Sequence, residues 1–266
     1  MVDSRRMSDI LTQILARKAE RLAEAKRQRP LAELERELAA GRQSARERFA
    51  AAVSRPDRVN VVAEVKRASP SKGLIRDDLD PVEVAVAYAA HAAAISVLTE
   101  EDYFLGSLET LRRIRERVGV PLLRKDFLFD DYQLVEAAAA GADAVLLIAA
   151  ALERAQLGDL LAAARDLALD VLVEVHTPQE LETVLHFGHL LIGVNNRNLK
   201  TFEVDVGTSF SIARLAPVDA LLVSESGIES RETIDSLRIA GFDAFLIGEH
   251  LMRAPAPGDA LGLIVR

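Results

Sequence analysis

The chain of 266 residues contains no cysteine and no tryptophan, and only 5% of its residues are aromatic. Without cysteine it cannot form disulfides, thiolate nucleophiles or Cys-based metal sites. Half of its residues are hydrophobic, so the core must be mainly aliphatic. No apolar run reaches the roughly 18 residues that a membrane-spanning helix needs. We therefore expect a cytoplasmic protein, without membrane contacts, that buries a large aliphatic core.

The first residues, MVDSRRMSDI, include basic side chains but no apolar segment behind them. This pattern argues against a secretory signal. Met1 and Met7 are both possible initiators, and the sequence does not decide between them.

The formal net charge is −8 at pH 7, although the first 60 residues are net basic. The rest of the chain is therefore strongly acidic, which argues against nucleic acid as a partner. Against this background, basic residues at the ends of apolar runs are unusual, because surface lysines are expected on helix faces.

Eight short apolar runs recur from Asn60 onward, about 20 to 35 residues apart, which is the spacing of βα units. Segments of helical character separate them, and some begin with a capping residue and a proline, as at Asp80-Pro81 and Thr177-Pro178. The pattern predicts an α/β fold, a (β/α)8 TIM barrel. A doubly wound sheet is the alternative, but no second domain follows the eight units. The expected strands are 61–66, 95–99, 121–125, 144–148, 171–175, 191–195, 221–224 and 244–247.

An N-terminal helical extension is expected ahead of the first strand. Ile10, Ile14 and Leu22 recur at helical spacing within 8–27, and a second charged helix is expected over 31–39. We expect residues 1–59 to pack on the barrel formed by 60–266, as one structural domain overall. A substrate-facing role for part of this extension is the alternative.

Charged residues stand at the C-terminal ends of several apolar runs, where burying an unpaired charge is costly. Glu64 and Lys66 share one face of their strand, since side chains two apart point the same way. The active site of such a barrel lies at the C-terminal ends of its strands, so Lys125 and Glu174 should converge with them on one cavity. This set offers an acid, a base and anion contacts. The alternatives are a structural Glu64–Lys66 ion pair and a Lys125 that only caps its strand.

Glycines follow the last two expected strands, in SESGI and LIGEH, and they predict a phosphate site. Such barrels often bind phosphate there through loop amides and a short helix. Gly227 and Gly248 would allow the backbone to approach phosphate oxygens closely. The polar loop 69–73 after the first strand is either a mobile flap over an anionic ligand or a simple turn.

Neither a metal nor a cofactor is expected. The five histidines are scattered without a nearby carboxylate cluster, and the chain has no dinucleotide-binding or Walker sequence.

Several motifs in series resemble the indole-3-glycerol phosphate synthase family of tryptophan biosynthesis. The similarity runs from about Asn60 to Met252, and the segment ILTQILARKAERL also resembles the family's N-terminal extension. The motifs are AEVKRASPSKG, SVLTEEDYFLGS, LLRKDF, GADAVLLI, LVEVH, IGVNNRNL, SESGI and FLIGEHLM.

The resemblance implies a barrel enzyme that converts 1-(2-carboxyphenylamino)-1-deoxyribulose 5-phosphate to indole-3-glycerol phosphate, losing carbon dioxide and water without a metal or cofactor. It implies that Lys125 is the general acid that protonates the ribulose carbonyl oxygen. By the same resemblance Glu174 is the general base, and Lys66 and Glu64 assist dehydration and anchor the ligand.

The resemblance also assigns the binding residues. Asn195 and Arg197 would bind the substrate near its carboxylate and hydroxyls, and Ser69 would lie in the flap. The aromatic ring would be walled by Phe104, Phe127 and Leu199, and the phosphate bound by Ser226, Gly227, Gly248 and Glu249, the last two mainly through backbone amides. Two departures are Ala93, where the family tends to have glycine, and the acidic Glu249, which is tolerable beside phosphate only if its side chain turns away.

Two other functions fit the sequence less well. Phosphoribosylanthranilate isomerase, another phosphate-binding barrel, would need a cysteine base that this chain lacks. A non-catalytic barrel that binds a phosphorylated metabolite would leave the acid and base positions vacant, and both are filled. We expect a small phosphorylated substrate as the partner, and a monomer or weak homo-oligomer.

Overall fold

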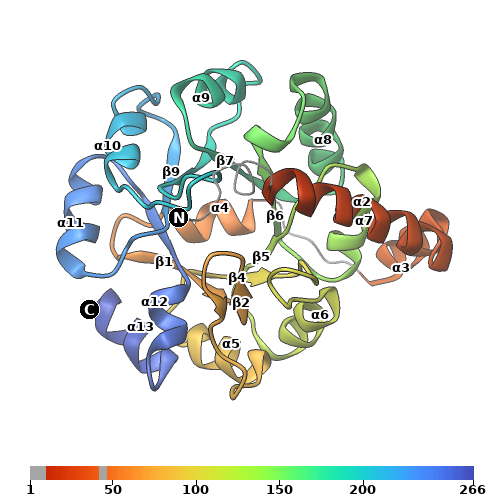
Figure 1. Ribbon diagram of the computed structural model, residues 1–266, viewed down its shortest axis with the longest axis horizontal. Coiled ribbons are helices and arrows are strands. Elements are labelled where there is room, and N and C mark those ends of the chain that lie inside the picture. The colour runs from red at the N-terminus through yellow and green to blue at the C-terminus, as the bar shows by residue number, and fades with distance from the viewer. Residues whose placement is uncertain (1–9, 42–46) are drawn as a thin grey trace, which may run out of the picture.

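A computed structural model of the chain describes residues 10–41 and 47–266. Its main strands are β1 (Asn60–Val65), β4 (Ala94–Leu98), β5 (Leu122–Lys125), β6 (Ala144–Ile148), β7 (Asp170–Val175), β8 (Leu191–Asn195), β9 (Leu221–Glu225) and β10 (Ala244–Ile247). All eight pair in parallel, and β1 also pairs with β4, so the sheet closes into a barrel (Figure 1). The predicted (β/α)8 barrel is confirmed, and the doubly wound alternative is wrong.

Helices connect the strands and surround the barrel (Figure 1). Several begin at a side-chain cap; Asp80 accepts from Val82 N, and Thr177 accepts from Glu180 N. Within residues 10–41 and 47–266 no helix is both long and apolar enough to cross a membrane. The surrounding helices are α5 (Pro81–Ala89), α6 (Leu108–Arg117), α7 (Asp131–Ala139), α8 (Arg154–Asp166), α9 (Pro178–Leu185), α10 (Gly207–Ala213), α11 (Arg231–Ile239), α12 (Glu249–Arg253) and α13 (Pro257–Val265), with a 3-10 turn, η1 (Ala149–Ala151), after β6.

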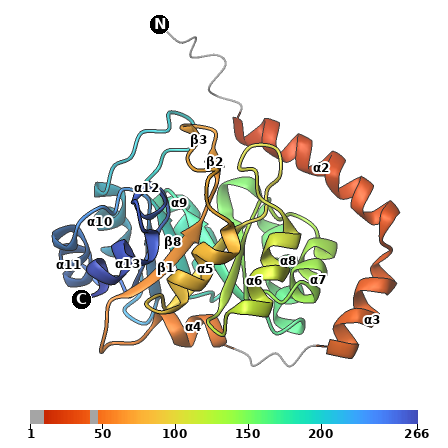
Figure 2. The ribbon, with the colours of Figure 1, turned by 90° about the horizontal axis from the view of Figure 1, so that it is seen from below.

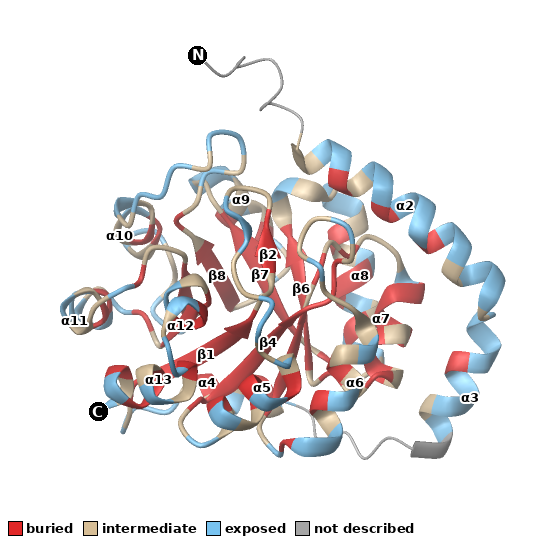
Figure 3. Cartoon of the chain, turned by 60° about the horizontal axis from the view of Figure 1, so that its bottom comes forward, coloured by how far each residue is buried: buried red, intermediate tan, exposed pale blue. Residues whose placement is uncertain are grey.

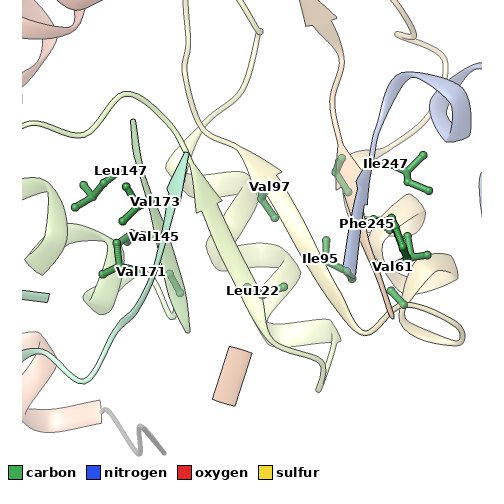
Figure 4. Packing of buried hydrophobic residues seen from close by; sticks show 14 of the residues in the cluster. Val61, Ile95, Val97, Leu122, Val145, Leu147, Val171, Val173, Phe245 and Ile247 are labelled. Carbon is green, nitrogen blue, oxygen red and sulfur yellow. The ribbon is translucent and has the colours of Figure 1, made fainter. Parts of the chain in front are cut away.

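The main core lies between the barrel and these helices. Most strand side chains that point outward are hydrophobic and buried, and they pack against the inner faces of the helices. Because strand side chains alternate, the other half of each strand faces the barrel interior. Figure 3 shows the buried strands surrounded by helices with exposed outer faces. The outward set includes Val61, Ile95, Val97, Leu122, Val145, Leu147, Val171, Val173, Phe245 and Ile247 (Figure 4).

The barrel interior is filled in layers by side chains from alternate strands. One layer, here called the apolar layer, comes from β1, β5, β7 and β9 and consists of Val62, Leu123, Leu172 and Val223, all buried. Two residues further along each of these strands lies the charged layer, which consists of Glu64, Lys125, Glu174 and Glu225. The charged layer therefore lies directly above the apolar layer, which forms the floor of the site.

A short helix closes the opposite end of the barrel. In α4 (Arg48–Val53), Phe49 and Val53 are fully buried and belong to the interior cluster. The Asp170 carboxylate accepts hydrogen bonds from the backbone N of Phe49, at 2.8 Å, and of Ala50, at 3.0 Å. Figure 2 shows α4 at the end of the barrel away from β2 and β3, the hairpin described below. The sequence analysis did not predict this helix.

The N-terminal segment forms α2 (Ile10–Gln28) and α3 (Leu31–Gly41). Leu22 and Leu34 pack with Tyr132 of α7, and the Tyr132 hydroxyl donates to the carbonyl of Arg29 at 2.8 Å. These helices agree with the predicted ranges 8–27 and 31–39 to within two residues at each described end. Ser8, Met1 and Met7 lie outside the described residues.

The loop after β1 forms a hairpin of two short strands, β2 (Ala68–Ser69) and β3 (Gly73–Leu74). Lys72 N donates to Ser69 O at 3.2 Å across its turn. The hairpin rises from the same end of the barrel as α2 (Figure 2), so both elements border the charged layer.

Candidate active site

A cavity of about 460 Å³ opens above the charged layer. Residues from α2 also form part of its wall, as does Lys72 of the hairpin. The structure brings every residue that the sequence analysis assigned to the site to this one cavity: Glu64, Lys66, Ser69, Phe104, Lys125, Phe127, Glu174, Asn195, Arg197, Leu199, Ser226, Gly227, Gly248 and Glu249.

Lys125 lies between two buried carboxylates. Its Nζ is 2.9 Å from Glu225 Oε2 and 3.2 Å from Glu174 Oε2. Burial alone would lower the pKa of this ammonium, but Glu225, Glu174 and then Glu64 outweigh it and raise the pKa above the ordinary lysine value. Lys125 is therefore a charged donor at the floor of the cavity.

The two carboxylates that share Lys125 differ in protonation. Burial opposes ionisation of Glu174, but Lys125, His176 and a hydrogen bond from Asn195 lower its pKa below the ordinary value. Burial and the neighbouring Glu174 raise the pKa of Glu225 to about 7, against the attraction of Lys125. Glu225 Oε1 has no hydrogen-bond partner in the part of the chain that the structure describes. Glu174 is thus the stronger anion, and Glu225 is able to exchange a proton near neutral pH.

The sequence analysis assigned no role to Glu225 or His176, although it quoted both. His176 Nε2 lies 3.3 Å from Glu174 Oε1, and Nδ1 lies 3.3 Å from Glu180 Oε2. The alternation of β9 contained a signal for Glu225, since it follows Val223 at the spacing that relates Glu174 to Leu172. Strand alternation could not identify Glu180 as the partner of His176, because Glu180 belongs to the following helix.

Lys66 and Glu64 form an ion pair, the contact given above as the structural alternative, with Lys66 Nζ 2.6 Å from Glu64 Oε1. Glu64 is buried, whereas the Lys66 side chain is 16% exposed and lines the cavity. A Cβ at position 248 would lie 2.2 Å from Glu64 Oε1. The glycine after β10 therefore makes room for Glu64, in addition to any contact with a ligand.

Asn195 is the last residue of β8 and Arg197 follows it by two residues, and both line the cavity. Asn195 Oδ1 accepts from Ser226 Oγ at 2.9 Å and from Arg197 N at 3.0 Å. The Arg197 guanidinium donates to Phe202 O at 3.1 Å, and it lines the cavity with its neighbours. Asn195 is therefore fixed on one side by the loop after β9 and on the other by its own chain.

The backbone after β9 turns sharply. Ser226 and Gly227 have φ angles of 69° and 74°, a region that a non-glycine residue occupies only when its surroundings hold it there. Asn196, which is buried, donates to Ser226 O at 3.0 Å and to Ser224 Oγ at 3.1 Å. This buried amide keeps the loop in a fixed conformation at the cavity wall.

The side chain of Glu249 is surrounded by cations. Its Oε1 accepts from Arg253 Nε at 3.0 Å and lies 4.0 Å from Lys72 Nζ, while Oε2 lies 3.8 Å from Arg197. The acidic side chain is thus balanced by three positive side chains, and Gly248 and Glu249 both line the cavity.

An apolar wall faces these charges. The rings of Phe104 and Phe127 are 6.2 Å apart and inclined by 40°, and Leu199 lines the same cavity. Ile14 of α2 adds to the wall, and the neighbouring Lys18 is buried, with Nζ 2.9 Å from Asp126 Oδ1. The extension is therefore joined to the residue next to Lys125.

Among the described residues, one acidic group, Glu100, Glu101 and Asp102, has carboxylates close enough to share a metal. Each carboxylate already has donors: Glu100 accepts from Tyr103 N at 2.7 Å, Glu101 pairs with Lys18, and Asp102 pairs with Arg21. These contacts account for the group structurally.

Comparison with known proteins agrees with the geometry. The family model described as indole-3-glycerol phosphate synthase matches residues 11–261. The indole-3-glycerol phosphate synthase of Bordetella pertussis is 48% identical over 263 residues, covering 97% of this chain and 100% of its own. That of Desulfotalea psychrophila is 48% identical over 261 residues, covering 98% and 100%.

Solved structures show the same fold at low identity. A 3-hexulose-6-phosphate synthase from Salmonella typhimurium superposes with a TM-score of 0.64 at 15% identity, covering 77% of this chain and 96% of its own. An orotidine 5'-phosphate decarboxylase from Pyrococcus horikoshii gives a TM-score of 0.57 at 16% identity, with the same coverage. These two support the barrel alone, whereas the family model and the close relatives cover nearly all of both sequences. The chain therefore belongs to the indole-3-glycerol phosphate synthase family.

Proposed function

We propose that this protein converts 1-(2-carboxyphenylamino)-1-deoxyribulose 5-phosphate to indole-3-glycerol phosphate, as a carboxy-lyase of tryptophan biosynthesis. The observation that carries the proposal is the position of Lys125, whose ammonium lies between Glu174 and Glu225 at the floor of the cavity. The glycine-containing loops after β9 and β10 and an aromatic wall border the same cavity. The arrangement suits a substrate that has a phosphate at one end and a benzoate ring at the other.

Binding would use three parts of the cavity. Backbone amides at Gly227 and Gly248 would hold the phosphate, because loop amides after the last two strands are common phosphate donors in such barrels. Phe104 and Phe127 would contact the ring, and Arg197 the carboxylate. Ser69, in the hairpin, would cover the ligand, and Leu199 would complete the apolar wall.

Ring closure would begin with a proton from Lys125. As its ammonium protonates the ribulose carbonyl oxygen, the ring carbon that bears the carboxylate attacks the carbonyl carbon and a carbon–carbon bond forms. The bond to the carboxylate then breaks, carbon dioxide leaves, and the electron pair restores the aromatic ring. The two carboxylates beside Lys125 hold it charged until the substrate takes its proton.

Dehydration would complete the indole. Lys66, which Glu64 holds at 2.6 Å, would protonate the hydroxyl that ring closure produced, and this group would leave as water. Glu174 would remove a proton from the carbon between this centre and the nitrogen, which forms the second double bond of the pyrrole ring. Asn195 would orient Glu174 through its amide.

A non-catalytic barrel that binds a phosphorylated metabolite is not favoured, because Lys125 and Glu174 fill the acid and base positions. The proposal includes a cytosolic setting, which the lack of cysteine supports, and a monomer or weak homo-oligomer.

The proposal is tested by incubating the purified protein with the carboxyphenylamino substrate and a chelator, and following indole fluorescence. We expect fluorescence to rise, with one carbon dioxide released for each indole formed. A protein that binds the substrate tightly but releases neither product would contradict the proposal and favour the non-catalytic barrel.

A further inference from the structure

A second cation contacts Glu174 on the side away from Lys125. Lys125 approaches Oε2 at 3.2 Å, whereas His176 Nε2 lies at the ion-pair distance of 3.3 Å from Oε1 and makes no hydrogen bond to the described residues. His176 follows Glu174 by two residues, so the alternation of β7 brings both side chains to the same side. The two oxygens of this one carboxylate thus have different positive partners.

Glu180 contacts the imidazole of His176 through the ring nitrogen that does not face Glu174. The imidazole Nδ1 lies 3.3 Å from Glu180 Oε2, and His176 N donates to the same oxygen at 2.7 Å. Glu180 lies in the first turn of α9, where its own backbone N donates to Thr177 Oγ1 at 3.2 Å. A backbone bond and a helix cap therefore fix the carboxylate that orients the imidazole.

We propose that His176, held by Glu180, is a positioning residue that keeps Glu174 ionised and oriented while Lys125 has given up its proton. The inference rests on the proposed function, since it concerns the interval between ring closure and dehydration. It adds a role for a residue of the LVEVH motif that the proposed mechanism leaves unused.

The physical reason is the changing charge of Lys125. While Lys125 is charged, it stabilises Glu174 and Glu225 together. Once it transfers its proton to the substrate, a buried Glu174 without another cation would itself take up a proton, because burial favours the neutral acid. The imidazolium of His176 remains beside Glu174 at that moment, so Glu174 stays ready to act as the base.

The surroundings of His176 are consistent with a permanent charge. Burial opposes its ionisation, but Glu174 and Glu180 outweigh burial and raise the pKa of His176 to about 10. The charged groups that face Glu174 are Lys125 from β5, His176 from β7 and Glu225 from β9. Glu225 has Lys125 as its cation, so it is the carboxylate expected to take up a proton when Lys125 becomes neutral.

The kinetic test compares the pH dependence of kcat in the wild type, His176→Asn and His176→Lys. In His176→Asn the acid limb of the kcat profile should move upward by at least about one pH unit, so that the loss of kcat at pH values below the wild-type limb is about tenfold greater than at pH 9. His176→Lys keeps a cation and should largely restore the wild-type limb. KM should change little in either variant, since His176 is not among the residues that line the cavity.

His186→Asn is the matched control, because His186 is an exposed histidine at the C-terminal end of α9, and its profile should equal that of the wild type. If His176→Asn lowers the unfolding temperature but leaves the acid limb unchanged, His176 serves the fold alone and the proposal is wrong. If that variant does not fold, Glu180→Gln replaces it, with a smaller shift expected in the same direction and an unchanged limb as the contrary result.

An assay without turnover separates this inference from the proposed function. In wild-type protein, NMR of the labelled imidazole should show His176 doubly protonated at pH 8, and Glu174→Gln should lower its titration midpoint. A His176 that titrates near 6.5, the ordinary histidine value, overturns the inference even if the enzyme is active. A protein that shows the charged imidazole but forms no indole contradicts only the proposed function.

Discussion

The apolar layer and the charged layer come from the same four strands, yet they have opposite effects on the molecule. Val62, Leu123, Leu172 and Val223 are buried aliphatic side chains, which stabilise the barrel by leaving water. Two residues further along lie three glutamates and one lysine, and two of these glutamates contact the lysine. Burying these charges is costly unless each is paired, so the charged layer is better explained by the proposed chemistry than by stability, and the apolar layer beneath it stabilises the barrel.

The comparison also shows how the charged layer is made tolerable. Lys125 is bound by two carboxylates and Glu64 by Lys66, whereas one oxygen of Glu225 has no partner among the described residues. Gly193 in β8 provides the space for that oxygen, since a Cβ there would lie 2.3 Å from Glu225 Oε1. The charges of this layer are therefore nearly all paired, and the exception is one carboxylate oxygen of Glu225.

The largest expected effect is on turnover in Lys125→Ala. Loss of the general acid should lower kcat by about 10⁴-fold, the upper end of the range for positioned acid catalysis, while the protein remains folded. Steady-state fluorescence assays measure kcat, and circular dichroism measures the fold. Lys26→Ala, which removes an exposed pair with Asp130, is the control and should keep wild-type turnover. Near-normal activity in folded Lys125→Ala would remove Lys125 as the acid.

Glu174→Gln should have the next largest effect, a decrease in kcat of about 10³-fold. The amide keeps the shape of the side chain but cannot accept a proton, so substrate affinity should change much less than turnover. Kd from equilibrium titration, measured beside kcat, separates the two quantities. A variant with weakened affinity and normal kcat would show that Glu174 only binds the ligand.

Leu172→Ala tests the apolar layer. Removing this fully buried side chain should lower the free energy of unfolding by about 3 kcal/mol, through lost burial and the cavity left behind. Because the charged layer is unaltered, kcat of the folded fraction should stay within a few-fold of wild type. Urea unfolding and the fluorescence assay measure the two effects. An unchanged stability would mean that this layer is not the floor that the structure indicates.

The smallest effect is expected in Glu225→Gln, and it depends on pH. The pKa of Glu225 is raised from 4.5 to about 7. Between these two pH values the folded state therefore holds a proton that the unfolded state has lost. Its contribution to stability therefore falls as pH rises from about 4.5 to 7. Glu225→Gln should be more stable than wild type at pH 8, by about 1–2 kcal/mol, and should show little gain at pH 4.5. Thermal unfolding at both pH values measures this, and an equal effect at both would contradict the raised pKa.

The strands were predictable from the sequence because each is a short aliphatic run between helical segments. Three residues of the charged layer were predictable for a similar reason, since Glu64, Lys125 and Glu174 each stand at the C-terminal end of such a run. Glu225 was missed because the serine before it suggested that its strand had already ended at Ser224, whereas pairing with β8 and β10 extends β9 to Glu225.

Long-range contacts explain the rest of what the sequence did not predict. Helix α4 has six residues and depends on the carboxylate of Asp170, which is about 120 positions further along the chain, so no local pattern marks it. The contact of His176 with Glu180 likewise exists only once β7 has placed the start of α9. Such features follow from the closed barrel and become visible only in the folded chain.

The most direct test of the separation between the two layers is a single side-by-side measurement of kcat and unfolding free energy for Lys125→Ala and Leu172→Ala. The account predicts that Lys125→Ala stays folded and loses turnover by orders of magnitude, while Leu172→Ala loses stability and keeps its turnover per folded molecule. If Lys125→Ala, folded and saturated with substrate, forms indole at the wild-type rate, the account is contradicted.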